Sequence, residues 1–247
     1  MFETENYLLQ RIKKTPIHLT LLDPEKSNPK KSSELAKLAE SAGSAAIMIG
    51  GSTLISQHDL DEVIKAIKQK VKIPIILFPG NISGISKYAD AIWFMSLLNS
   101  DNSYFITGAQ ALAAPIIQRY GLEPIPLGYI IVGEGGTAGI VGRAQAIPYN
   151  KPEVAALYAL AAQYFGMRFV YLEAGSGAKE PVPAKMIKTV RKHLDIPLIV
   201  GGGLRKASDV KRAVEAGANI IVTGTLFEKE PLIKEKLSEI IKAMKIK

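Results

Sequence analysis

Eight short apolar runs alternate with amphipathic helical patterns along the chain, and this alternation restricts the possible folds more than any other feature. We predict strands at 17–23, 45–51, 73–80, 91–97, 124–132, 169–175, 196–203 and 219–225. We predict helices at 31–42, 57–70, 106–120, 150–165, 182–192, 206–216 and 230–245. Alternation of this kind with eight strands is typical of an α/β fold, a TIM (β/α)8 barrel of parallel strands.

One connection does not fit the pattern. Only residues 81–90 separate the third and fourth strands, and Gly84 lies within them, whereas a parallel crossover normally needs a dozen or more residues and a helix. We therefore expect a loop or a single turn there, in a barrel that lacks a regular third helix. No Pro/Ser-rich linker or low-complexity tract divides the 247 residues, which predicts one domain spanning 1–247.

Composition excludes several classes of function. The chain has no cysteine, which removes disulfides, thiolate nucleophiles and zinc–thiolate sites. No apolar run approaches the roughly 20 residues of a membrane-spanning helix, and the first residues lack the order of a secretory signal, so we expect a cytoplasmic protein. The net charge is +8, but the lysines are dispersed over helix faces without interleaved aromatic residues. We expect no nucleic-acid binding, and at most peripheral contact with an anionic membrane.

Three strand ends in the second half of the chain carry glycine-rich loops. Residues 171–177 read YLEAGSG, residues 196–203 read IPLIVGGG and residues 219–225 read NIIVTGT. Glycine has no Cβ, so the backbone amides of a glycine-rich loop can approach an oxyanion closely. TIM barrels commonly bind phosphate at the loops after strands seven and eight. These loops predict an anion site at the barrel mouth. The alternative is that small residues only let the strands turn tightly into helices.

Six motifs lie in the same order at successive strand ends. They read HLTLLDPEK (18–26), GGST (50–53), FPGN (78–81), YLEAGSGA (171–178), VGGGLR (200–205) and VTGT (222–225). Together they resemble the geranylgeranylglyceryl phosphate synthases, barrel prenyltransferases that form the first ether bond of archaeal membrane phospholipids. The related bacterial heptaprenylglyceryl phosphate synthases share most of them. The resemblance covers nearly the whole chain, and that family also lacks a regular third helix.

The resemblance implies a reaction and a set of site residues. The enzyme joins sn-glycerol 1-phosphate to geranylgeranyl diphosphate, releases diphosphate and requires Mg²⁺; a homo-oligomer, either a dimer or a hexamer, is also implied. Glycerol would lie along Tyr171, Leu172, Glu173, Ala174, Gly175, Ser176 and Gly177. The phosphate would sit on Gly202, Gly203, Gly224 and Thr225, and Asp23 and Ser52 would hold the metal.

The residue types suit these tasks. Asp23 follows an apolar run and precedes a proline, so its carboxylate projects at the mouth as a hard oxygen ligand, although it could simply cap a helix or turn. Ser52 is more often a helix cap than a ligand. Glu173 can accept a hydrogen bond or the proton from the attacking hydroxyl, with Tyr171 on the same strand face; the alternative is a structural ion pair. We expect the metal and phosphate sites on opposite sides of the mouth.

Weaker signals concern the rim of the site. Five aromatic residues are candidates for a prenyl groove, namely Phe78, Trp93, Phe94, Tyr104 and Phe105, although core packing is the alternative explanation. Tyr104 and Phe105 are our candidates for the residue that limits donor length. Residues 133–144 form a long glycine-rich loop that could cover the site as a mobile lid. The chain departs from the family pattern at Asn102-Ser103, where many members have Asn-Pro. His18 is expected to be a hydrogen-bonded core or rim histidine.

Two other classes of function share some of these features. Another phosphate-binding barrel enzyme, such as an isomerase or cyclase, would have the same loops after strands seven and eight. A non-catalytic phosphoglycerol-binding protein would also need them. Release of diphosphate separates the prenyltransferase from both.

Overall fold

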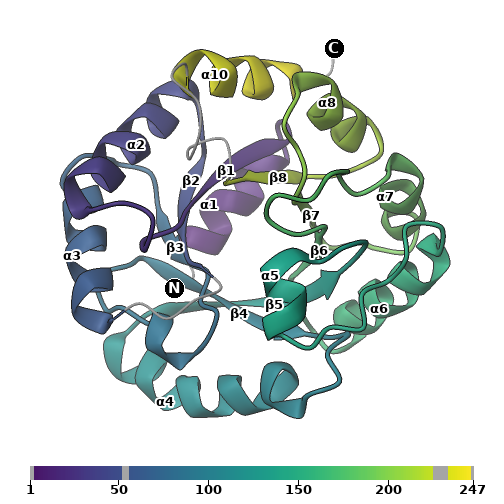
Figure 1. Ribbon diagram of the computed structural model, residues 1–247, viewed down its shortest axis with the longest axis horizontal. Coiled ribbons are helices and arrows are strands. Elements are labelled where there is room, and N and C mark those ends of the chain that lie inside the picture. The colour runs from purple at the N-terminus through teal and green to yellow at the C-terminus, as the bar shows by residue number, and fades with distance from the viewer. Residues whose placement is uncertain (1–2, 52–55, 225–232, 246–247) are drawn as a thin grey trace.

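The computed structural model describes residues 3–51, 56–224 and 233–245, and within them eight parallel strands close into a barrel (Figure 1). Each strand pairs with its neighbours in sequence, and β8 pairs with β1. The strands are β1 (Ile17–Leu22), β2 (Ala46–Ile49), β3 (Ile75–Leu77), β4 (Ala91–Leu97), β5 (Glu123–Ile131), β6 (Phe169–Glu173), β7 (Leu198–Gly201) and β8 (Ile220–Thr223). The predicted TIM barrel is confirmed, and each observed strand overlaps its predicted range.

A ring of helices surrounds the barrel (Figure 1). The helices are α2 (Pro29–Ala42), α3 (Gln57–Lys68), α4 (Ala109–Tyr120), α6 (Pro152–Tyr164), α7 (Ala184–Arg191), α8 (Ala207–Glu215) and α10 (Ile233–Ala243). Between β3 and β4 the chain forms only a 3₁₀ turn, η1 (Ile82–Gly84). The absence of a regular helix in this connection is therefore confirmed. Within the described residues, no helix has the length and apolar character that crossing a membrane requires.

Two cores follow from the alternation of side chains along each strand. One set faces the helices, for example Ile47, Ile92 and Val200. The other set fills the inside of the barrel and includes Trp93 and Phe169, whose rings pack edge to face with their centroids 5.2 Å apart. The barrel interior is thus packed with side chains, and this rigid core supports the loops at its two ends.

Helix α1 (Glu3–Ile12) closes the N-terminal end of the barrel and was not predicted. Its Leu8 is fully buried in the inner core. The carboxylate of Glu123, the first residue of β5, accepts hydrogen bonds from the backbone N–H groups of Thr4 and Glu5 at 2.8 and 2.9 Å. A carboxylate at this position satisfies the free amides of a helix start and favours its dipole. Glu5 also pairs with Arg168 at 2.6 Å. Any open site must therefore lie at the other end.

Candidate active site

A cavity of about 810 Å³ opens at the carboxyl ends of the strands, the end opposite α1. One part is lined by the strand-end residues that follow β1, β6, β7 and β8. The other part is apolar and extends outward past η1 to α4, where Ala109, Ala113 and Ile117 line it. The shape of the cavity follows from the short β3–β4 connection, because a single turn takes the place in which other crossovers put a helix.

The loop after β7 lies directly against the loop after β6. Gly202 and Gly203 line the cavity and have φ values of +81° and +68°, which side chains rarely adopt. A Cβ on Gly202 would collide with Glu173 Oε1 and would lie 2.6 Å from the backbone nitrogen of Gly175. Gly224 also lines the cavity, whereas Thr225 lies outside the described residues. The three described glycines of the predicted phosphate site are therefore brought together at one wall.

Glu173 and Tyr171 project from β6 into the same region. Both line the cavity, yet their exposed fractions are only 6 % and 0 %. Glu173 Oε1 accepts a hydrogen bond of 2.6 Å from the N–H of Gly175. Burial raises the pKa of the Glu173 carboxyl, while hydrogen bonds from Tyr171 and from the Gly175 N–H act in the opposite direction. A buried carboxyl with a raised pKa and fixed orientation is suited to accept a proton from a bound hydroxyl.

Tyr129 also lines the cavity, although the sequence pattern did not predict it as a site residue. Its ring meets those of Phe78 and Tyr171 at centroid distances of 5.4 and 5.3 Å, and Phe78 stacks on Tyr171 at 5.7 Å. Tyr129 and Tyr171 are register partners on β5 and β6, so the pairing of these strands could have revealed the contact. Burial raises the pKa of both tyrosines, and the carboxylate of Glu173 adds to this effect. Both hydroxyls therefore stay protonated and can donate hydrogen bonds.

Asp23 follows β1 at the rim of the same cavity. Its side chain is 19 % exposed and lies 3.4 Å from the ammonium group of Lys26. It was expected across the mouth from the phosphate site, and that expectation was wrong: β1 is paired with β8, so Asp23 and Gly224 follow neighbouring strands. In a closed barrel the first strand lies beside the last, so this neighbourhood already follows from the predicted fold.

Ser52, the second predicted metal ligand, lies outside the described residues. Within residues 3–51, 56–224 and 233–245, no three His, Cys, Asp or Glu side chains gather as metal ligands. Mg²⁺ commonly uses one or two protein carboxylates and takes its remaining ligands from water and substrate phosphates. The partly exposed Asp23 carboxylate beside a cavity fits such a sparse site.

The cavity lining includes most of the predicted aromatic set. Phe78, Trp93, Phe94 and Phe105 line the cavity. Tyr104 is not among its described lining residues; its ring packs edge-on against Phe105, with centroids 5.2 Å apart. Phe105 is therefore the better candidate for a side chain that touches a bound hydrocarbon chain.

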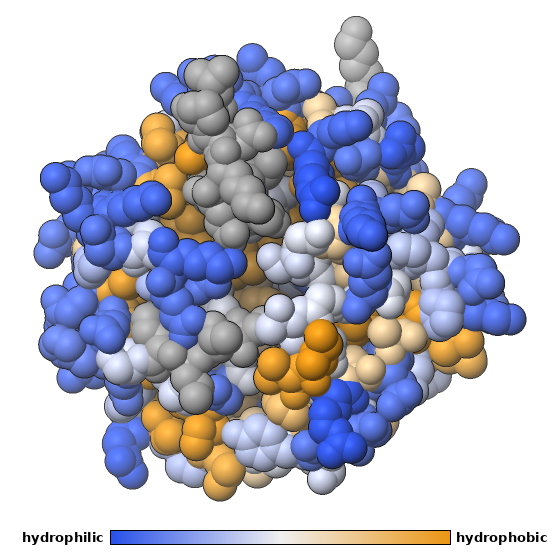
Figure 2. Space-filling view, viewed as in Figure 1, coloured by the Kyte–Doolittle hydropathy of each residue, from blue (hydrophilic) through white to orange (hydrophobic). Residues whose placement is uncertain are grey.

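The glycine-rich segment 133–144 contains a short helix, α5 (Gly136–Val141), where a loop was expected. Thr137, Ala138 and Val141 line the cavity, and Ile140 is 80 % exposed at its rim. Figure 2 shows hydrophobic side chains over α5 on this face. The helix thus covers part of the cavity with apolar side chains.

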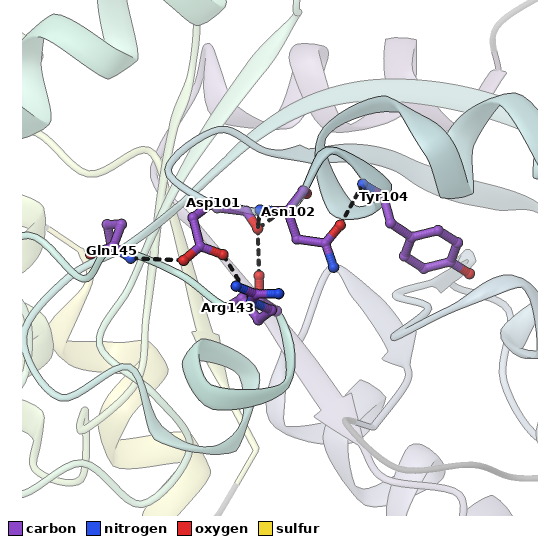
Figure 3. Close-up of polar contacts among 7 residues, drawn as sticks. Asp101, Asn102, Tyr104, Arg143 and Gln145 are labelled. Carbon is purple, nitrogen blue, oxygen red and sulfur yellow. Dashed lines mark hydrogen bonds and ion pairs between the residues drawn. The ribbon is translucent and has the colours of Figure 1, made fainter.

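Polar contacts fasten the end of α5 to the loop after β4 (Figure 3). The carboxylate of Asp101 pairs with Arg143 Nε at 2.9 Å and accepts a hydrogen bond of 3.1 Å from Gln145. In the same loop, the side-chain oxygen of Asn102 accepts a hydrogen bond of 3.0 Å from the N–H of Tyr104. This contact closes the turn at Asn102-Ser103 where many members of the resembled family have a proline.

His18 lies in β1 and is buried, as expected; hydrogen bonds join its ring to Ser44 and Thr223. The other two histidines, His58 and His193, are exposed on helical or turn segments. The histidines therefore form no metal-binding group within the described residues.

Comparison with known proteins identifies a group of relatives. Residues 9–244 match the PcrB family. The chain is 54 % identical to the geranylgeranylglyceryl phosphate synthase of Thermococcus gammatolerans, over 99 % of this chain and 98 % of the relative. It is 55 % identical to the Pyrococcus furiosus enzyme of the same name, over 94 % and 93 % of the two chains.

Solved structures agree with these relatives. The crystal structure of (S)-3-O-geranylgeranylglyceryl phosphate synthase from Thermoplasma acidophilum, in complex with substrate sn-glycerol-1-phosphate, has a TM-score of 0.95 and 43 % identity to this chain. The match covers 99 % of this chain and 98 % of that one. A thiamine phosphate pyrophosphorylase from Pyrococcus furiosus has a TM-score of 0.60 at 12 % identity, which reflects the barrel fold alone.

Proposed function

The chain belongs to the PcrB family, and since its relatives named above are geranylgeranylglyceryl phosphate synthases, we propose that it joins sn-glycerol 1-phosphate to a prenyl diphosphate in the cavity at the barrel mouth. The products are 3-O-prenylglyceryl phosphate and diphosphate. The observation that carries the proposal is the two-part cavity, because a glycine-lined polar end and an apolar arm suit a phosphate and a hydrocarbon chain in one site.

The polar end supports a specific placement of glycerol phosphate. The phosphate sits beside Gly202, Gly203 and Gly224, where loop amides can approach it closely. The glycerol then lies along the strand end and loop from Tyr171 to Gly177, within reach of Glu173. Thr225 and Ser52 lie outside the described residues. Their predicted roles, in phosphate binding and metal binding respectively, stay predictions.

The residues of β6 support the chemistry of the transfer. The glycerol hydroxyl oxygen forms a bond to the allylic carbon of the donor, and the bond from that carbon to the diphosphate oxygen breaks. Glu173 accepts a hydrogen bond from the attacking hydroxyl and receives its proton, while the protonated Tyr171 holds the carboxylate and the glycerol in place. If the bond between the allylic carbon and the diphosphate breaks before the hydroxyl attacks, the reaction depends less on Glu173 as a base. Glu173 then acts mainly by positioning the hydroxyl.

Asp23 is the described residue that would hold Mg²⁺. A bound Mg²⁺ would neutralise charge on the departing diphosphate. The side chain is partly exposed at the cavity rim, so a hydrated ion can reach it.

An Asp23→Asn substitution should raise the Mg²⁺ concentration needed for half-maximal activity by at least about tenfold, since it removes the charged ligand. Glycerol phosphate affinity measured without Mg²⁺ should stay the same or increase, because Asp23 and Gly224 follow neighbouring strands and one anionic group is lost near the phosphate. Titration of Mg²⁺ in the assay and calorimetry without metal give the two values. A weaker glycerol phosphate affinity with an unchanged Mg²⁺ requirement would show that Asp23 has a structural role.

The apolar arm supports a long donor chain. Contact with hydrocarbon contributes about 25 cal/mol for each Å² removed from water, so every isoprene unit that fits adds to affinity. We propose a 20-carbon donor, geranylgeranyl diphosphate; a longer donor such as the heptaprenyl compound is the alternative.

Phe105→Ala should enlarge the arm and raise the relative use of donors longer than 20 carbons by about tenfold or more. Tyr104→Ala is the matched control, because Tyr104 packs against Phe105 but is not among the described lining residues. Competition between prenyl diphosphates of different length, with products separated by mass spectrometry, measures the preference. If the two variants and the native protein give the same profile, neither aromatic residue limits the chain.

The assay that tests the whole proposal combines the purified protein with sn-glycerol 1-phosphate, Mg²⁺ and geranylgeranyl diphosphate. We expect release of diphosphate and an ether product of the corresponding mass. Binding of glycerol phosphate without diphosphate release from any donor would favour an isomerase, a cyclase or a binding protein instead. A cytoplasmic location, peripheral membrane contact and a dimeric or hexameric assembly remain predictions, and sedimentation of the pure protein would establish the assembly.

A further inference from the structure

Four buried polar side chains form a continuous hydrogen-bonded chain that ends at the last residue of β8. Thr20 Oγ1 lies 2.9 Å from Ser44 Oγ, which lies 2.9 Å from His18 Nδ1, and His18 Nε2 lies 2.8 Å from Thr223 Oγ1. Their exposed fractions are 0, 3, 1 and 4 % in that order. We call these residues the His18 chain. It uses both ring nitrogens, and nothing in the proposed reaction has given it a role.

The two ends of the His18 chain differ in their surroundings. Thr20 is in the middle of β1, and within the described residues its hydroxyl has no other hydrogen-bond partner. Thr223 is the last residue of β8, directly before Gly224, and it lines the cavity. One end is therefore enclosed by protein, and the other reaches the wall that we assign to phosphate.

The imidazole of His18 is neutral, because burial lowers its pKa to about 3. A neutral imidazole donates from one nitrogen and accepts at the other, so the protons of the chain can run in either of two directions. In the first, Thr223 donates to Nε2, the Nδ1 proton goes to Ser44, and Ser44 donates to Thr20. In the second, Thr20 donates to Ser44, Ser44 donates to Nδ1, and the Nε2 proton goes to Thr223.

The surroundings select the second direction. In the first, the Thr20 proton is left at a fully buried position with no acceptor within the described residues, and such an orphaned group is costly. In the second, the unused proton belongs to Thr223, which borders the cavity, where water or an anionic ligand can accept it. Hydrogen bonds aligned in one sense also strengthen one another.

We propose that His18 is a positioning residue that holds the Thr223 hydroxyl as a hydrogen-bond donor to the phosphate group of the bound substrate. The inference rests on the proposed function, which places that phosphate beside Gly224. It adds a side-chain donor to the glycine amides at this wall. It also gives a physical reason for a histidine on a strand that is otherwise almost entirely apolar.

The protonation of His18 can be read directly without any ligand. In protein labelled with ¹⁵N-histidine, nitrogen chemical shifts distinguish a protonated from an unprotonated ring nitrogen. His58 and His193 are exposed, and the set of ring signals that is lost in His18→Gln identifies those of His18. We expect a proton on Nε2 and none on Nδ1, and a shift of the Nε2 signal when glycerol phosphate is added. A proton on Nδ1 would overturn the proposal.

Binding measurements test the donor itself. Thr223→Val removes the hydroxyl at nearly constant shape and should weaken sn-glycerol 1-phosphate binding by about tenfold or more, and raise KM for that substrate with little change in kcat. Thr223→Ser keeps the hydroxyl and should bind as the native protein does. Thr20→Val is the matched control, since it removes the hydroxyl at the enclosed end and should leave the affinity unchanged.

Melting temperatures of all three variants separate loss of binding from loss of folding. If Thr223→Val and the native protein have equal affinities, Thr223 does not donate to the phosphate and the inference is wrong. If Thr20→Val loses as much affinity as Thr223→Val, the His18 chain is only structural. If the native protein itself does not bind glycerol phosphate, the proposed function fails, while the nitrogen spectrum still decides the direction of the His18 chain.

Discussion

Glu173→Gln should lower the turnover of the prenyl transfer by about 100-fold or more, because it keeps the size of the side chain but removes the basic group nearest the glycerol hydroxyl. Substrate affinities should change little, since the amide oxygen can still accept the hydrogen bond from the Gly175 N–H. Single-turnover kinetics with saturating substrates measure the step. Native-like turnover would exclude Glu173 as both base and positioning group.

The raised pKa of Glu173 gives this prediction a pH dependence. Burial disfavours the ionised form, so the carboxylate that accepts the proton is lost as pH falls through a pKa above the ordinary value for glutamate. In the pH profile of the rate, the fall in activity at low pH should therefore occur above the usual carboxyl range, and it should vanish in Glu173→Gln.

The same burial means that the folded state binds the proton more tightly than the unfolded chain does. Stability from this group is present at low pH and is lost as pH rises through the raised pKa, so Glu173→Gln should unfold at a higher temperature than the native protein at neutral pH.

Gly202→Ala should abolish measurable glycerol phosphate binding. The added Cβ would collide with the Glu173 carboxylate and crowd the nitrogens of Ala174 and Gly175, so the loops after β6 and β7 cannot keep their contact. The left-handed backbone adds a cost of about 1–2 kcal/mol to folding. Calorimetry with sn-glycerol 1-phosphate measures the affinity, and denaturant unfolding measures the stability.

Gly166→Ala is the matched control for backbone strain. Gly166 has a φ of +79°, close to the +81° of Gly202, but nothing lies within 4 Å of its would-be Cβ. The two variants should lose similar stability from the backbone, and only Gly202→Ala should lose binding. Full glycerol phosphate affinity in Gly202→Ala would place the phosphate elsewhere in the cavity.

Local sequence patterns were sufficient to predict the barrel and the wall of the site. Strands and helices leave a period in the sequence, and parallel strands place all their carboxyl ends on one side, so Glu173, Gly202 and Gly224 could be assigned to one mouth from the order of the strands alone. The absence of a regular helix between β3 and β4 was also predicted, because residues 81–90 are too few for a full crossover helix.

Other features depend on contacts between distant residues. Helix α1 was missed because the carboxylate that caps it belongs to Glu123, which is 119 residues from Thr4 and 118 residues from Glu5 in the sequence. The hydrogen-bond partners of His18 are Ser44, which precedes β2, and Thr223 at the end of β8. No spacing in the sequence indicates either partner.

The sequence by itself determined the number of strands, the order of the crossovers and the strand ends that carry the site, because each is encoded over a few neighbouring residues. Only the tertiary structure decided how far the cavity extends toward α4 and which buried hydroxyls His18 joins. These depend on chain closure and on close packing between segments far apart in the chain, and such contacts exist only when the whole barrel has formed.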